Sequence, residues 1–182
     1  YSSLTLLPVL FLSNKPFNKK TTILFLCAIP LGYVVYYAGG SILMNPSLPF
    51  IGNKLAIYQA AVEKGKMTVG INIFDPLHIM SIMLFYYLLL FKDSLTKLCD
   101  DFPILLKTSA IGLSLYSALA FLPVLALRTS QLYCIVNILL YTYIIYTFKQ
   151  KWIGISMVVV ISLLLLYVSI PHYGLGMMII PN

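Results

Sequence analysis

Long runs of apolar residues constrain this chain more than any other feature. Hydrophobic residues make up 60% of its 182 residues and charged residues only 9%, with a mean hydropathy of +0.95. A soluble domain carries about 25% charged residues. The composition therefore predicts an all-α polytopic integral membrane protein.

Six apolar segments are visible, at 4–13, 21–44, 75–91, 102–127, 132–148 and 152–170. A spanning helix needs about 20 apolar residues, with a range of roughly 17 to 25, and the last five segments fit that range. None alternates with the period of two expected of a transmembrane barrel strand. We expect about six transmembrane helices in one transmembrane domain over residues 1–182. Because the chain opens on Tyr1, almost inside an apolar run, we expect it to be the C-terminal part of a longer protein.

Lysines cluster in alternate connections between these segments. They are Lys15, Lys19, Lys20, Lys92, Lys97, Lys149 and Lys151. Connections that alternate along the chain share one face of the membrane, and by the positive-inside rule that face is cytoplasmic. Lys107 is expected to snorkel toward the same face. The net charge of +7 thus reflects topology, and nucleic-acid binding is not expected.

The opposite, extracytoplasmic face receives a large loop at 45–72, the turn around Arg128 and the tail from residue 171. Within the loop, Asn53 is a suitable N-cap for a helix over residues 54–63. Leu55, Tyr58 and Val62 recur there at helical spacing. This pattern predicts a short amphipathic helix on the outer membrane surface.

The sequence contains no motif for a metal, nucleotide or other cofactor. Its cysteines lie far apart and form no C-x-x-C pair, and the two histidines lack metal-ligand spacing. The acidic pair Asp100-Asp101 resembles the paired acids of metal-dependent glycosyltransferases, but a solvated charged loop is the favoured interpretation.

Arg128 is the only arginine of the chain and lies between two apolar runs. A guanidinium group binds phosphate bidentately and stays charged at any relevant pH. Two interpretations are open on topology alone: Arg128 grips a lipid diphosphate, or it anchors its helix at the membrane interface.

Two stretches carry a family resemblance. They are Asn53-Lys-Leu-Ala-Ile-Tyr58 in the large loop, and Leu125-Ala-Leu-Arg-Thr-Ser-Gln-Leu-Tyr-Cys-Ile-Val-Asn137 before the fifth segment. Together with the lysine-bearing loops, this arrangement resembles the C-terminal half of a Wzy-type O-antigen polymerase of the EpsG-like family.

The resemblance implies a glycosyltransferase of lipopolysaccharide biosynthesis in the bacterial inner membrane. Such an enzyme joins oligosaccharide repeat units carried on undecaprenyl diphosphate, which serve as both donor and acceptor, at the periplasmic face. No metal or nucleotide is expected. The lipid bilayer and a chain-length regulator are the other expected partners.

Residue roles follow from that reaction. A fixed cation beside the leaving diphosphate stabilises the transition state, which is the role predicted for Arg128. His172 and Glu63 are the leading candidates for a general base, with His78 as a third, although the diphosphate itself could take the proton. The expected substrate-binding residues are Lys54, Tyr58, Gln59, His78 and Tyr133.

Three other functions remain open. A flippase for lipid-linked sugars should carry polar residues through the depth of the bilayer. The deep parts of the apolar segments hold almost none, which favours a reaction on one face. A membrane acyltransferase that modifies polysaccharide would need a histidine embedded in the membrane, and His78 is the candidate. The third is a purely structural membrane subunit.

Overall fold

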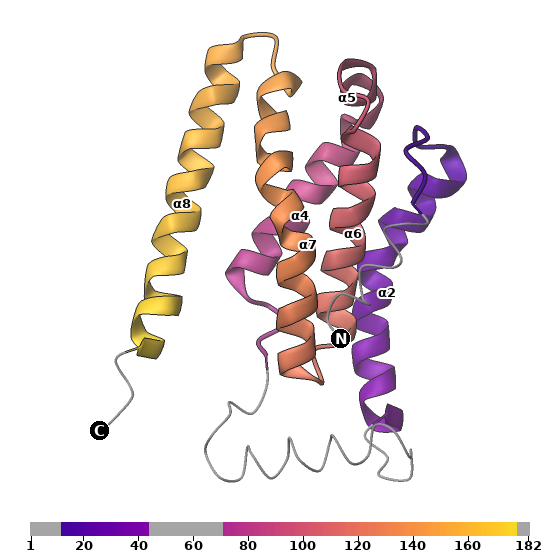
Figure 1. The fold of residues 1–182 in the computed structure, drawn as a ribbon, viewed down its shortest axis with the longest axis vertical. Helices are drawn as coiled ribbons and strands as arrows, with labels where there is room; N and C mark the ends of the chain where they lie inside the picture. Colours follow the sequence, from indigo (N-terminus) through magenta and orange to yellow (C-terminus); the bar gives the residue numbers. More distant parts are fainter. Residues whose placement is uncertain (1–11, 44–70, 178–182) are drawn as a thin grey trace.

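The computed structural model describes residues 12–43 and 71–177, and every regular element in these ranges is a helix. The elements are α2 (Lys19–Leu43), α4 (Pro76–Leu90), α5 (Lys92–Leu98), α6 (Phe102–Ala118), α7 (Pro123–Tyr143), the short 3-10 helix η2 (Ile144–Thr147) and α8 (Lys151–Met177) (Figure 1). The all-α prediction is confirmed for this part of the chain. The expected amphipathic helix over 54–63 lies outside the described residues.

The described helices supply three candidate membrane spans, or four, and not about six. Three segments are long and apolar enough, at Lys19–Ala38, Leu125–Thr147 and Lys151–Val168. Helices α4 and α5 meet at a bend of 77° and would make the fourth. Most of the expected first span, residues 4–11, lies outside the described residues. The chain is therefore a helical membrane protein with fewer spans in view than hydropathy suggested.

The expected span over 102–127 is wrong at its C-terminal end. Helix α6 stops at Ala118 and α7 begins at Pro123, with Leu122 in an extended conformation (φ −117°, ψ 81°). The ring of a proline disfavours helical geometry in the residue before it, while its fixed φ suits the first turn of a new helix. Leucines on both sides keep the hydropathy high across this break.

Helix α6 is the central helix and also a short one. Its 17 residues span about 25 Å at the usual helical rise, less than the hydrocarbon core of about 30 Å. It packs against α2 and α7 over its length and also against α4 (Figure 1). Phe102, Leu106 and Leu113 are buried at these contacts. Neighbouring helices thus shield α6 from lipid.

Two glycines allow this close packing. A methyl group on Gly112 of α6 would overlap the Cβ atom of Tyr133 on α7. A methyl group on Gly32 of α2 would lie 2.6 Å from the backbone oxygen of Ser114 on α6. Small residues at such crossings let helix backbones approach closely in a membrane.

The lysine-bearing segments gather at one end of the bundle, as the sequence predicted. The start of α2, helix α5 and the connection from η2 to α8 all lie at the upper end in Figure 1. The α6–α7 turn and the end of α2 lie at the opposite end. We call these the lysine end and the opposite end.

Lys107 does not reach water as a snorkelling lysine would. Its side chain is 5% exposed, and its Nζ atom donates hydrogen bonds to the backbone oxygens of Ser13 at 2.6 Å and Lys15 at 2.8 Å. The ammonium group also lies 5.3 Å from the centre of the Phe17 ring. Lys107 therefore fastens the segment that precedes α2 to the centre of the bundle.

We predict that Gly112→Ala destabilises the protein. Overpacking a tight contact costs about 1–3 kcal/mol, and here the opposing atom is a Cβ fixed to the α7 backbone. The gain of about 1 kcal/mol from replacing glycine in a helix offsets only part of that cost. Denaturant unfolding in detergent micelles measures the difference. Val159→Ile, which adds one carbon at a site that is 51% exposed, should change little. An unchanged unfolding midpoint for Gly112→Ala would contradict the close packing.

Candidate functional site

Polar side chains are buried deep in the bundle, contrary to the expectation from the apolar segments. Those on α6 are Lys107, Thr108, Ser109 and Ser117. In the described part of the chain every buried side-chain nitrogen and oxygen has a hydrogen-bond partner. An unpaired polar group would be costly in an apolar environment, so these groups are paired with one another or with the backbone.

One of these pairs joins α6 to α7. The hydroxyl of Ser109 donates a hydrogen bond to Oδ1 of Asn137 at 2.7 Å. The side chains are 2% and 6% exposed. This bond fixes the register of the two helices about one turn from the Gly112 contact.

His78 forms the second pair, near the start of α4. Its Nε2 atom lies 3.1 Å from the hydroxyl oxygen of Ser117, which in turn donates to the backbone oxygen of Leu113 at 3.3 Å. In the tautomer that carries its proton on Nε2, His78 donates to Ser117 and Nδ1 is the basic nitrogen. The centre of the imidazole ring lies 4.3 Å from that of the Tyr116 ring, with the planes tilted by 36°, and 6.4 Å from that of the Tyr33 ring.

A cavity of about 280 Å³ opens beside His78, between α4, α6, α7 and α8. We call it the mixed cavity, because polar groups interrupt an otherwise apolar lining. The residues with polar groups are Asp75, His78, Ser81, Tyr116, Ser130, Gln131, Asn137 and Tyr141. Helix α4 with its N-cap Asp75, and helices α6 and α7, supply them, and α8 adds the apolar Leu165, so only the assembled bundle creates this concave site.

The sequence predicts Arg128 in an interhelical turn, and this is wrong. Arg128 lies within α7, five residues after the first residue of that helix, Pro123. Its side chain is exposed. Helical geometry places it one turn before Gln131, which lines the mixed cavity, and about 4.5 Å nearer the start of the helix. The start of α7 lies at the opposite end from the lysines (Figure 1). Arg128 is thus an exposed residue whose neighbours Leu127 and Gln131 line the cavity, although it does not line the cavity itself.

Tyr133 holds a packing position. It is 1% exposed, lies against Gly112 and does not line the mixed cavity. Its contact with substrate stays a prediction. The same helix face that brings Ser130 and Asn137 to the interior also buries this ring.

The other predicted site residues are not described. Lys54, Tyr58, Gln59 and Glu63 lie outside the described residues. His172 follows the expected sixth span in the sequence, but helix α8 continues to Met177 and includes it. The His172 side chain is also outside the description. His78 is therefore the one candidate base that can be placed in a cavity.

The acidic pair agrees with its favoured interpretation. Asp100 and Asp101 are both exposed in the turn between α5 and α6. Within residues 12–43 and 71–177, no three His, Cys, Asp or Glu side chains are placed to hold a metal ion.

Sequence reasoning missed the residues that support His78 and shape the cavity. Ser117, Ser109 and Asn137 are the main ones. A signal existed for Ser109, because it lies three residues before Gly112 and shares one face of a helix with it. Small and hydroxylated residues on one helix face indicate a helix–helix contact in a membrane.

Comparison with family models, curated proteins and solved structures gave no match for this chain. The argument for function therefore rests on the residues and their arrangement.

We predict an energetic coupling between His78 and Ser117. A double-mutant cycle with His78→Phe and Ser117→Ala should give a coupling free energy of about 0.6 kcal/mol, and no more than about 1.7 kcal/mol. This is the range for hydrogen bonds within membrane bundles. Denaturant unfolding in detergent micelles provides the four stabilities. Ser81→Ala is the matched control, because the Ser81 hydroxyl bonds Leu77 in its own helix at 2.9 Å. If His78→Phe and Ser117→Ala change the free energy of unfolding additively, the hydrogen bond between the two side chains contributes nothing to stability.

Proposed function

We propose that this chain acts in a polysaccharide polymerase that joins oligosaccharide repeat units carried on undecaprenyl diphosphate. The reaction belongs to the periplasmic face of the bacterial inner membrane. The observation that carries the proposal is the position of Arg128: an exposed arginine on α7 whose neighbours Leu127 and Gln131 line a cavity with His78, at the end of the bundle away from the lysines.

The reaction needs a cation and a proton acceptor close together. The acceptor hydroxyl attacks the anomeric carbon of the donor sugar while the bond from that carbon to the diphosphate oxygen breaks. The diphosphate leaves with the electron pair, and the hydroxyl proton passes to a base. A fixed guanidinium stabilises the charge that gathers on the leaving diphosphate.

His78 is the base that the described residues favour. With the tautomer that donates from Nε2 to Ser117, Nδ1 takes the proton. It lines the mixed cavity together with Asp75, and the cavity provides room for part of a polar substrate. Glu63 and His172 stay as alternatives from the sequence.

A flippase for the same lipid-linked sugars is the second candidate. The buried polar residues of α6 favour it more than the apolar segments suggested, because transport needs polar groups across the bilayer. Against it, Ser109 and Lys107 are already paired with Asn137 and with backbone oxygens.

We predict that Arg128→Lys abolishes long polysaccharide chains. Lysine keeps the charge but loses the bidentate geometry, and removal of one such contact lowers turnover by roughly 10²- to 10³-fold. Lipopolysaccharide ladders from a complemented deletion strain, at equal protein abundance, measure the effect. Lys149→Arg, the reverse exchange at an exposed site of the lysine end, is the control and should give normal ladders. Normal ladders from Arg128→Lys would refute the proposed role of this residue.

Deletion of the gene separates the two candidate functions. Loss of a polymerase leaves a single repeat unit on the lipopolysaccharide core, because units still cross the membrane. Loss of a flippase leaves none. We expect the single unit, and a core without any repeat unit would favour transport.

A further inference from the structure

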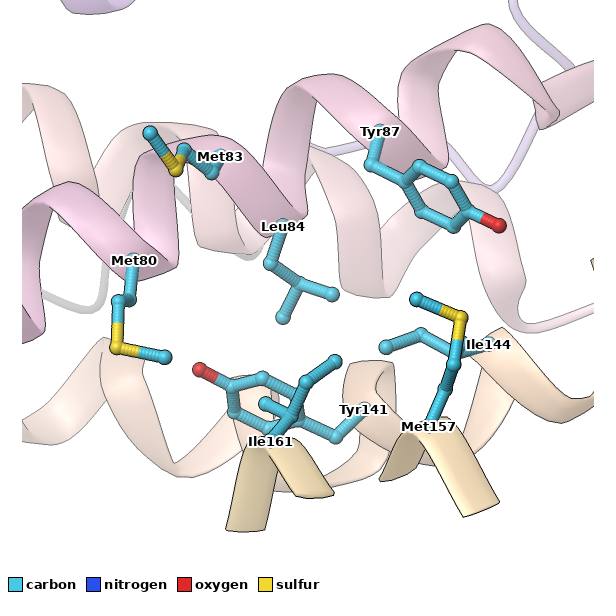
Figure 2. Close-up of a pocket in the computed structure, with 8 residues that line it drawn as sticks. All are labelled: Met80, Met83, Leu84, Tyr87, Tyr141, Ile144, Met157 and Ile161. Atoms are coloured by element: carbon cyan, nitrogen blue, oxygen red, sulfur yellow. The ribbon is translucent and has the colours of Figure 1, made fainter. Parts of the chain in front are cut away.

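An apolar groove of about 230 Å³ lies between α4, η2 and the first half of α8. Figure 2 shows side chains of α4, among them Met80 and Leu84, facing Ile144, Met157 and Ile161 across the gap. The hydroxyl of Tyr87 is engaged with Thr147 at 2.8 Å, which leaves its ring to line the groove. The lining offers hydrocarbon and thioether groups and almost no hydrogen-bonding group.

The groove is open on one side. Leu84 and Ile144 form a buried floor, whereas Met83 is 66% exposed and Met157 is 41% exposed at the rim. Met157 is on α8, which contains a candidate membrane span, and Met83 is on α4, which together with α5 makes the possible fourth span. The open side therefore faces lipid, and an occupant can enter from the bilayer without crossing water.

The apolar groove adjoins the mixed cavity. Tyr141 lines both. On α8, Ile161 lines the groove and Leu165, one helical turn further on, lines the cavity. On α4, Ser81 and Leu84 are similarly about one turn apart. The two form one crevice that is polar toward the opposite end of the bundle and apolar toward the lysine end.

We infer that this crevice binds one polyprenyl-type lipid, with its single hydrocarbon chain in the apolar groove and its polar head in the mixed cavity. The change of polarity along the crevice matches an amphiphile whose head faces the end that bears Arg128. The apolar groove of about 230 Å³ that adjoins the mixed cavity at Tyr141 suits a lipid with one chain per head better than a diacyl phospholipid. Methionine side chains adapt to a branched chain.

The groove selects and orients the chain more than it adds affinity. A lipid tail is already in an apolar medium, so moving it from bilayer to protein gives no hydrophobic gain, and only packing contributes. The head in the mixed cavity supplies the polar contacts. Where the tail lies is consequently the property to measure.

This inference rests on the proposed function for the identity of the head group, a lipid-linked diphosphate. The position of the tail follows from the crevice alone. The two can therefore fail separately.

The test is photolabelling of the purified protein in phosphatidylcholine nanodiscs with a diazirine-bearing polyprenyl phosphate, mapped by mass spectrometry. We expect labels on groove residues, with Met80 and Met157 foremost. Ile161→Trp should reduce this labelling roughly tenfold, the change that about 1.4 kcal/mol of lost binding produces. Met157→Trp fills the groove from its exposed rim and is the second variant. Each variant must elute from gel filtration as the wild type does.

Leu163→Trp is the matched control, because Leu163 is 60% exposed and lies on the opposite face of α8 from Ile161. It should leave the labelling of the groove unchanged. Equal labelling of the Leu163 face and the groove, or labelling that survives both filling variants, would show bulk lipid contact and overturn the inference. Groove labelling of equal strength by a diazirine-bearing diacyl phosphatidylcholine would overturn the single-chain assignment.

Lipopolysaccharide ladders distinguish the two failures. Groove labelling together with normal ladders from Arg128→Lys would retain the lipid site and reject the role of Arg128. Loss of the ladders in Arg128→Lys, together with no groove labelling in the wild type, would retain the role of Arg128 and reject the lipid site.

Discussion

The close approach of α6 to α7 and α2 is the contact on which the rest of the structure depends. Inside a membrane, helices gain nothing from leaving an apolar solvent, so packing and hydrogen bonds must hold them together. Gly112 and Gly32 allow the backbones to meet, and the Ser109–Asn137 bond fixes the register of α6 and α7. With that register set, α6 presents Ser117 to His78 and α7 presents Ser130 and Gln131 to the mixed cavity.

A short, shielded central helix explains how polar groups persist so deep in an apolar chain. Helix α6 is surrounded by its neighbours, and its buried polar atoms are paired within the described residues. The crevice forms where α4 and α8 do not close fully on this centre. Its polarity changes along its length, so a molecule with a polar head and an apolar chain meets matching surroundings in one orientation.

The sequence predicted the elements well where apolar runs end at charged residues. The expected segments at 21–44 and 75–91 agree with α2 and α4 within two residues at each end. The prediction failed around Pro123, because leucines on both sides keep the average hydropathy high while α6 ends at Ala118 and a new helix begins at the proline. That single break moves Arg128 from a turn into a helix. In the site, His78 was identified in advance, whereas Ser117 and Asn137 were not.

The sequence by itself determined the class of the protein. Its composition requires a membrane, its apolar runs require helices because the backbone must pair internally in lipid, and its lysines mark one end of the bundle. Only the tertiary structure decided which polar residues meet. His78 and Ser117 are 39 residues apart, and Ser109 and Asn137 are 28 apart. Contacts across such separations depend on how helix faces pack and on where glycines allow close approach, which local composition does not encode.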